Sequence, residues 1–161
     1  MGGDSNISCG SMKYVLLDFD GVLTSDAFSR QCIFEHRREN LFGVDWFDPS
    51  CIDALRYMVM KTGAKIVISS SWRDLGEYRL RKLWEYNQMP GALDEKTPTT
   101  PEYILMKEDA LKHWIVSHEK ERFVVLDDDN LDVPNLVKTN PQVGLTRENS
   151  EKAICILNEV S

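Results

Sequence analysis

Two aspartates, Asp18 and Asp20, stand one residue apart at the end of an apolar run at residues 14–18, and Gly21 follows them. Successive side chains of a strand point to opposite faces, but a glycine just beyond the strand allows a turn that brings both carboxylates together. Neighbouring anions are costly unless a cation lies between them. The pair is therefore typical of metal-assisted phosphoryl transfer. An ordinary strand end followed by an Asx turn is the alternative.

Two further apolar runs also end in oxygen-bearing side chains. A serine cluster follows the run at residues 64–68, and an acidic cluster follows the run at residues 122–126; these clusters are Ser69, Ser70 and Ser71, and Asp127, Asp128 and Asp129. Ligands of open parallel sheets bind outside the carboxyl ends of the strands, so we expect the clusters to meet in space. Carboxylates suit a hard cation such as Mg²⁺, and serine hydroxyls with backbone N–H groups suit phosphate oxygens.

The elements that must position these clusters alternate between strand and helix patterns, which predicts an α/β fold with a mainly parallel sheet covered on both faces. Strands are expected at residues 14–18, 64–68, 122–126 and 136–138. Helices are expected between Asp48 and Gly63, at residues 73–87 and 102–117, and after Thr146.

The segment at residues 25–46 carries no clear pattern and is rich in aromatic and charged residues. We expect an irregular flap there, because long inserts are usually lids or binding loops. His36, Arg37 and Arg38 would bind a phosphate backbone or stack on a ring, or they belong to a solvated flap. The second interpretation is slightly favoured, and the role of the flap stays open.

Length and composition predict the number of domains and the class of protein. The 161 residues predict one domain at residues 12–161, preceded by a small polar stretch at residues 1–11 that is typical of a vector-derived tail. Hydrophobic residues make up 42% and charged residues 28%, and no apolar run is long enough for a membrane span. A net charge of −7 gives no general basic surface for nucleic acid. The four cysteines are scattered without metal-ligand spacing, and the three outside the predicted tail cannot all pair within the chain, so we expect a reducing, cytoplasmic setting. We expect no membrane partner.

The order of the motifs resembles the haloacid dehalogenase (HAD) superfamily, whose phosphatases carry Asp-x-Asp, a Ser or Thr, a Lys or Arg, and an acidic motif. The resemblance implies a three-layer Rossmann-like fold. It makes Asp18 the nucleophile, which forms an aspartyl-phosphate, and Asp20 the general acid and base. It also implies Mg²⁺ held by Asp18, the backbone carbonyl of Asp20 and Asp128. Asp127 is a further candidate ligand or orients the cationic residue, and Asp129 ranks lower.

Two positions of the family pattern have competing candidates. Ser70 is preferred over Ser69 as the motif hydroxyl, because it stands two residues before Trp72, as the threonine does in related sequences of the form Thr-x-Trp. Lys107 is the preferred catalytic cation, with Lys96 as the second choice. Candidate phosphate-binding residues are Ser69, Ser71, Arg73 and Gly21.

The strings Ser-Ser-Ser-Trp-Arg and Leu-Asp-Asp-Asp more narrowly resemble the small HAD domains of multidomain RNA-repair proteins. The short segments between the motifs leave room for a minimal cap only, so we expect an open site. The expected function is a magnesium-dependent phosphatase for a phosphomonoester on a nucleic-acid end, a nucleotide or a phosphoprotein. Net charge does not support a nucleic-acid partner. The alternative is a non-catalytic regulatory module that binds metal or phosphate on the same scaffold.

Overall fold

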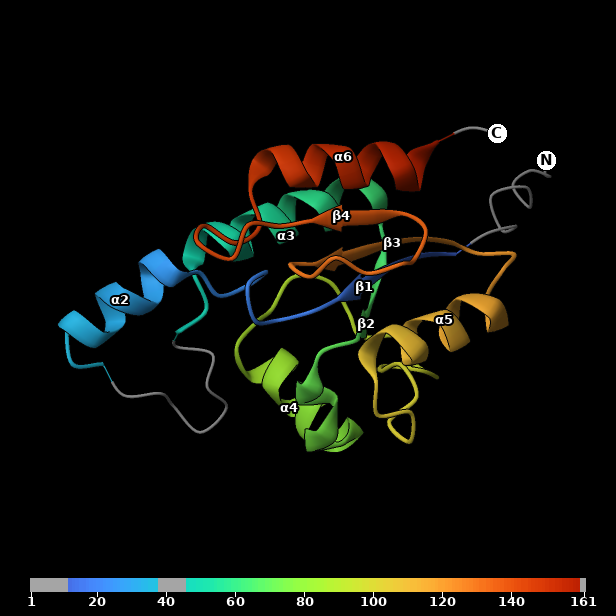
Figure 1. Cartoon of the computed structure of the whole chain (residues 1–161), viewed down its shortest axis with the longest axis horizontal. Coiled ribbons are helices and arrows are strands. Elements are labelled where there is room, and N and C mark those ends of the chain that lie inside the picture. Colours follow the sequence, from blue (N-terminus) through green and yellow to red (C-terminus); the bar gives the residue numbers. More distant parts are fainter. Residues whose placement is uncertain (1–11, 38–45, 160–161) are drawn as a thin grey trace.

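The computed structural model describes residues 12–37 and 46–159. Its centre is a four-stranded sheet in the order β2-β1-β3-β4, in which every neighbouring pair is parallel (Figure 1). The strands are β1 (Lys13–Leu17), β2 (Lys65–Ile68), β3 (Arg122–Asp127) and β4 (Leu136–Lys138). This confirms the predicted α/β, Rossmann-like architecture. All four strands end at the same edge of the sheet.

Helices cover both faces of the sheet, with α3 and α6 on one side and α5 on the other (Figure 1), and the buried residues of α4 belong to the same core as those of α3 and α6. The helices are α2 (Asp26–Phe34), α3 (Pro49–Thr62), the 3-10 helix η2 (Ser71–Leu75), α4 (Glu77–Tyr86), α5 (Lys107–Ser117) and α6 (Arg147–Asn158). Every helix among the described residues is too short or too polar to cross a membrane.

Alternating side chains of β1 join two separate cores. Val15 and Leu17 belong to the larger core, which includes the buried faces of α3 and α6. Leu16 belongs to the smaller core, where Leu111 and Trp114 of α5 contact the opposite face. The central strand is therefore buried on both sides, as a parallel sheet requires.

The helix ends follow local sequence signals. Asp48 caps α3 by accepting a hydrogen bond from Ser50 N, and Gly63 ends that helix in the left-handed region at φ 69°. Thr146 and Asn149 form a capping box at the start of α6.

Three expectations about the helices need correction. The first nine residues after Ser25 form the helix α2 rather than an irregular flap; only Cys32 of this helix is buried, so it lacks a continuous apolar stripe. The helix expected at residues 73–87 is divided at Gly76 (φ 89°) into η2 and α4. The helix expected from residue 102 begins at Lys107, because residues 101–106 form a loop.

The remaining expectations about residues 25–46 are only partly addressed. Arg37 forms an ion pair with Glu35 at 2.7 Å, and its guanidinium lies over the Phe28 ring. Arg38 and the predicted tail at residues 1–11 lie outside the described residues. The single-domain boundaries and the role of the flap stay predictions.

Candidate active site

The carboxyl edge of the sheet holds a pocket of about 400 Å³. Seven of the site residues proposed from sequence line it, namely Asp18, Asp20, Ser69, Ser71, Arg73, Lys107 and Asp128. Backbone hydrogen bonds align the strand ends: Asp18 N donates to Leu126 O at 3.1 Å, and Ser69 N donates to Leu17 O at 2.9 Å. Residues far apart in sequence thus converge as the parallel topology predicts.

Three carboxylates form a compact group at this edge. Oxygen atoms of Asp18, Asp127 and Asp128 all lie within 4.8 Å of one another. Asp18 and Asp127 are buried, and Asp128 is half-buried. Hard oxygen ligands at this spacing fit Mg²⁺, which is usually held by one or two carboxylates together with substrate oxygens. The residues present therefore fit the implied cofactor.

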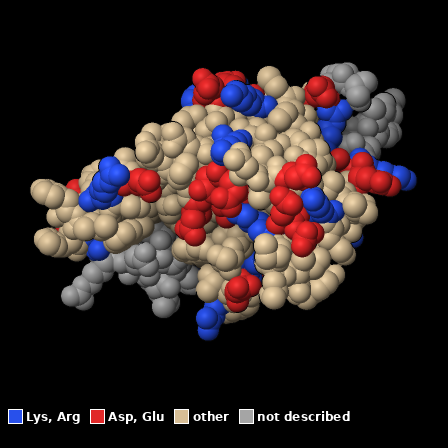
Figure 2. All heavy atoms as spheres, in the orientation of Figure 1, with Lys and Arg blue, Asp and Glu red and all other residues tan. Residues whose placement is uncertain are grey.

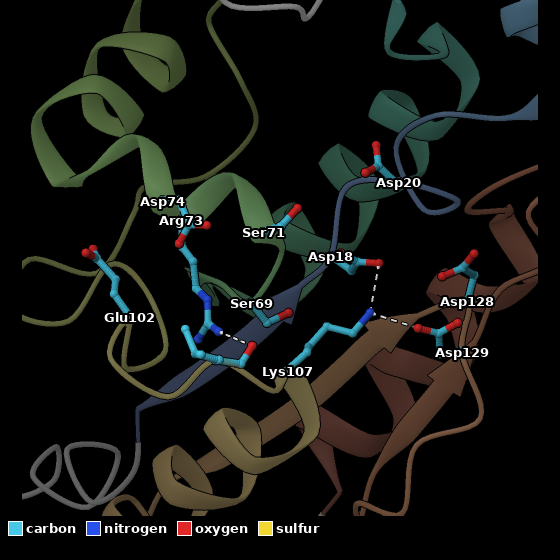
Figure 3. A pocket seen from close by; sticks show the side chains of 11 residues that line it. Asp18, Asp20, Ser69, Ser71, Arg73, Asp74, Glu102, Lys107, Asp128 and Asp129 are labelled. Carbon is cyan, nitrogen blue, oxygen red and sulfur yellow. Dashed lines mark hydrogen bonds and ion pairs between the residues drawn. The ribbon is translucent and has the colours of Figure 1, made fainter.

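Lys107, the first residue of α5, places its ammonium among these acids (Figure 3). Its Nζ lies 2.9 Å from Asp127 Oδ2, 3.1 Å from Asp129 Oδ2 and 3.5 Å from Asp18 Oδ2. Lys96, the competing candidate, is exposed and lies outside the pocket lining. The structure thus brings the preferred lysine, and not the alternative, to the site.

Burial and charge shift the protonation of this group. Burial, followed by the neighbouring Asp127 charge, raises the pKa of Asp18 to about 7, although Lys107 acts in the opposite direction. Burial also raises the pKa of Asp127. Burial alone would lower the pKa of Lys107, but Asp18 and Asp127 outweigh it and raise that pKa. A further positive charge close to this cluster would therefore stabilise the ionised form of its carboxylates.

The turn after Asp18 packs directly against the acidic motif. Gly21 has φ 79°, and a Cβ atom at this position would collide with the Asp128 carboxylate. The Gly21 N–H donates to Thr24 Oγ1, and its carbonyl accepts a hydrogen bond from buried Thr139 at 2.7 Å. The Gly21 backbone is thus used within the turn, and its missing side chain makes room for Asp128; phosphate binding by Gly21 stays a prediction.

The two candidate serines, Ser69 and Ser70, differ in their hydrogen-bond partners. The Ser70 hydroxyl accepts a hydrogen bond from Trp72 N at 3.0 Å and caps η2. The Ser69 hydroxyl lines the pocket, is buried, and has no hydrogen-bond partner among the described residues. A buried hydroxyl without a partner is unfavourable unless a ligand satisfies it. Ser69 is thus the serine whose hydroxyl is free to contact a ligand in the pocket, and Ser71 lies at the exposed rim. Which serine is the motif hydroxyl stays a prediction.

Arg73 has a structural role that differs from the predicted phosphate contact. Its guanidinium is buried and donates to Thr100 Oγ1 at 2.9 Å, Pro101 O at 2.8 Å and Ile104 O at 2.7 Å. Its donors are directed at the 101–106 loop, so they fix this loop against η2. These partners were not predicted because the loop was assigned to a helix, and a phosphate contact by Arg73, which also lines the pocket, stays a prediction.

Asp20 and Asp129 lie at the edge of the carboxylate group. The Asp20 side chain is exposed, lines the pocket and stands apart from the Lys107 cluster in Figure 3. This position suits a group that exchanges protons with a leaving oxygen or water better than a metal ligand. Asp129 is 62% exposed and reaches Lys107 from the outside.

Three lining residues were missed at the sequence level: Asp74, Glu102 and Leu105. None belongs to a motif, and the latter two fell within the helix expected at residues 102–117, so no local pattern marked them. Six acidic and two basic residues line the pocket, so its lining is predominantly acidic. Figure 2 shows acidic side chains gathered near the middle of the view, with basic ones between and around them.

Comparisons with known proteins agree with this arrangement. The family model described as "HAD domain in Swiss Army Knife RNA repair proteins" matches residues 14–150. Searches of curated proteins and of solved structures gave no match.

Proposed function

This chain belongs to the family of HAD domains in Swiss Army Knife RNA repair proteins, and from that premise we propose that it is a magnesium-dependent phosphatase for phosphomonoesters. Family membership supports a HAD-type, phosphatase-like function in general terms. The finer proposal rests mainly on one observation: the Lys107 ammonium lies 3.5 Å from Asp18 within a group of three close carboxylates.

Asp18 is the proposed nucleophile. Its ionised oxygen would attack phosphorus, forming an Oδ–P bond while the bond from phosphorus to the leaving oxygen breaks. Lys107 would hold Asp18 and the phosphoryl oxygens in place, and the unpartnered Ser69 hydroxyl would donate to one of these oxygens. Asp127, whose oxygens lie 3.1 and 2.9 Å from Lys107 Nζ, would orient that lysine.

Asp20 is the proposed proton donor and acceptor. Its carboxylic acid would protonate the leaving oxygen, and the resulting carboxylate would then remove a proton from water. The water oxygen attacks phosphorus, the Asp18–phosphorus bond breaks, and inorganic phosphate leaves with Asp18 restored. The exposed position of Asp20 gives it access to both water and the alcohol.

Asp18 and Asp128, together with the backbone carbonyl of Asp20, are the groups that would hold Mg²⁺, which would neutralise the carboxylates and the phosphoryl oxygens. A cation there would also keep Asp18 ionised, against the burial that raises its pKa. We therefore assign Asp127 mainly to Lys107 and the remaining carboxylates to the metal.

The proposed substrates are large phosphomonoesters, such as a nucleic-acid end, a nucleotide or a phosphoprotein. The insert after Asp20 contributes the nine-residue helix α2, and the stretch between Ser71 and Lys107 contributes η2, α4 and a loop. Neither forms a separate cap domain in the described residues. A substrate attached to a larger body would thus have access to the pocket.

The test is Mg²⁺-dependent hydrolysis of p-nitrophenyl phosphate by the wild type, Asp18→Asn and a control, Asp53→Asn. Asp53 is a surface residue of α3 with a 77% exposed side chain. We expect turnover in the wild type and control, and its loss in Asp18→Asn. Full turnover by Asp18→Asn would exclude Asp18 as the nucleophile.

A second measurement distinguishes the enzyme from a non-catalytic module. Beryllofluoride mimics a phosphoryl group bound to a carboxylate, so it should raise the melting temperature of the wild type only when Mg²⁺ is present. The absence of any such shift, together with no turnover, would favour the regulatory module.

A further inference from the structure

The 101–106 loop, which lies beside the pocket, is held in place by the buried side chain of Arg73. The buried Arg73 guanidinium donates to the carbonyls of Pro101 and Ile104 and to the hydroxyl of Thr100, at 2.7 to 2.9 Å. Leu105 O is a further, longer partner at 3.5 Å. A charged group buried against backbone carbonyls orders the loop before any ligand binds, and such preorganisation lowers the cost of binding.

The same loop exposes large apolar side chains. Tyr103 is 77% exposed, Leu105 88% and Met106 67%. Apolar side chains that are clustered and exposed on a rigid surface often mark a binding site. Leu105 lines the candidate active-site pocket, so this apolar group begins at the wall of the phosphate site.

The loop also lines a second cavity. Its volume is about 500 Å³, and it is bounded by Tyr103, by Lys96 and by His113 of α5 together with His118 just after that helix. Glu102 lines both this cavity and the active-site pocket, so the two adjoin at this residue. A substrate whose phosphate lies beside Lys107 would therefore place its alcohol group along the loop.

The charges around the pocket restrict which charged groups the alcohol part of the substrate can carry. The two basic lining residues are already engaged, Arg73 with the loop and Lys107 with the carboxylates. Asp74 and Glu102 lie at the rim without an ion pair in the described residues. A second anionic group held within the active-site pocket would thus meet repulsion and no free lysine or arginine of that lining, whereas, among the described residues, Lys96 is the one lysine lining the second cavity.

We propose that the 101–106 loop is the recognition surface for the alcohol part of the substrate, and that this part is an uncharged, ring-bearing group attached to a single phosphate. This inference rests on the phosphatase function proposed above, and among the substrates named there it disfavours a nucleic-acid end, whose neighbouring nucleotides carry further phosphates. Leu105 and Tyr103 provide apolar contact for the ring, and Glu102 disfavours a second anion. Tyr103 and Glu102 are specificity-determining residues in this scheme.

Binding of non-hydrolysable phosphonates, measured by calorimetry with Mg²⁺, tests the apolar contact independently of turnover. Phenylphosphonate should bind about tenfold more tightly than methylphosphonate, as expected for burial of part of a ring. The double variant Tyr103→Ala/Leu105→Ala should remove this preference and leave methylphosphonate binding unchanged. Tyr78→Ala, which changes a 73% exposed tyrosine of α4 outside both cavities, should keep it.

The charge discrimination has its own matched pair of ligands. The compound 4-phosphonobenzoate adds one carboxylate to the same ring, and it should bind about threefold more weakly than phenylphosphonate. Glu102→Gln should remove this difference, whereas Glu119→Gln, an exposed change outside both cavities, should not.

Several results would overturn the inference. These are equal binding of phenylphosphonate and methylphosphonate by the wild type, an unchanged preference in the double variant, and tighter binding of 4-phosphonobenzoate or of a 5′-phosphorylated RNA oligomer. If only the proposed function is wrong, ring-selective binding will be observed without any hydrolysis of phenyl phosphate. The two ideas can therefore fail separately.

Discussion

The ammonium nitrogen of Lys107 lies 2.9 Å from Oδ2 of Asp127, a carboxylate that is completely buried. Replacing the lysine leaves this charge without its partner. We expect Lys107→Met to lower the free energy of unfolding by on the order of 3 kcal/mol and to reduce kcat by about a hundredfold or more. Urea denaturation and steady-state kinetics measure the two effects.

The exposed Lys96 is the matched control for that experiment, since Lys96→Met removes an equal charge outside the pocket lining. It should leave both quantities unchanged. A Lys107→Met protein with wild-type kcat would exclude this lysine from the chemistry, whatever its stability.

Two adjacent serines should give opposite phenotypes. Ser69→Ala removes an unpartnered hydroxyl in the pocket, so we expect kcat/KM to fall by at least about tenfold with little loss of stability. Ser70→Ala removes the cap of η2, so it should cost about 1 kcal/mol of stability and leave kcat/KM within about twofold. The reverse pattern would restore Ser70 as the motif hydroxyl.

Gly21 and Gly63 offer another matched comparison, because both have positive φ, at 79° and 69°. Alanine at either site carries the same backbone penalty of about 1–2 kcal/mol. Only at Gly21 does the added Cβ meet the Asp128 carboxylate; at Gly63 it meets nothing within 4 Å. Gly21→Ala should therefore also abolish the Mg²⁺-induced rise in melting temperature, which Gly63→Ala should retain.

The effect of Mg²⁺ should depend on pH through Asp18. Without metal, burial raises the pKa of this carboxyl to about 7, so the folded protein holds a proton that the unfolded chain releases near its usual pKa of 3.8. Ionising Asp18 thus costs folding stability as the pH rises from about 4 to about 7. Mg²⁺ binds the ionised form, so its stabilisation should increase over this range.

Thermal melts at about pH 5.5 and about pH 8, with and without Mg²⁺, measure this linkage. The Mg²⁺-induced shift should be larger at the higher pH. Asp18→Asn cannot ionise, so its shift should be smaller and less dependent on pH. Equal wild-type shifts at both pH values would contradict the assignment of Asp18 as a ligand.

Arg73 provides a test of the loop anchor. Arg73→Ala leaves the carbonyls of Pro101 and Ile104 without their buried donor, so a loss of about 2–4 kcal/mol is expected. Arg73→Lys retains the charge but supplies a single nitrogen, and it should recover only part of this loss. Wild-type stability of Arg73→Ala would show that the loop is held by other contacts.

The sheet was predictable because each strand is a short apolar run with a distinct polar end. Parallel pairing then determines where Asp18, Ser69 and Asp127 meet, since the register aligns Leu17 with both Ile68 and Leu126. The proximity of these residues, which are far apart in sequence, could thus be predicted from the local strand pattern together with the rule that ligands bind at the carboxyl ends of parallel strands.

Side-chain partners were less predictable than strand positions. Ser69 and Ser70 are chemically identical, and only the backbone turn decides which one caps η2. Arg73 is a plausible phosphate ligand by type, but its partners are carbonyls some thirty residues away. The helix α2 was missed because its residues are mostly exposed, and its sequence therefore lacks the periodic apolar positions that predict a helix.

The pairing of Lys13 with Arg122 in adjacent strands has a consequence for when the candidate site forms during folding. Asp18 stands about a hundred residues before Lys107 and Asp128 in the sequence. Without β3, the strand β1 lacks one of its two neighbours, and the acidic motif is absent from the edge of the sheet. The three residues therefore meet only after this long-range strand pair has closed.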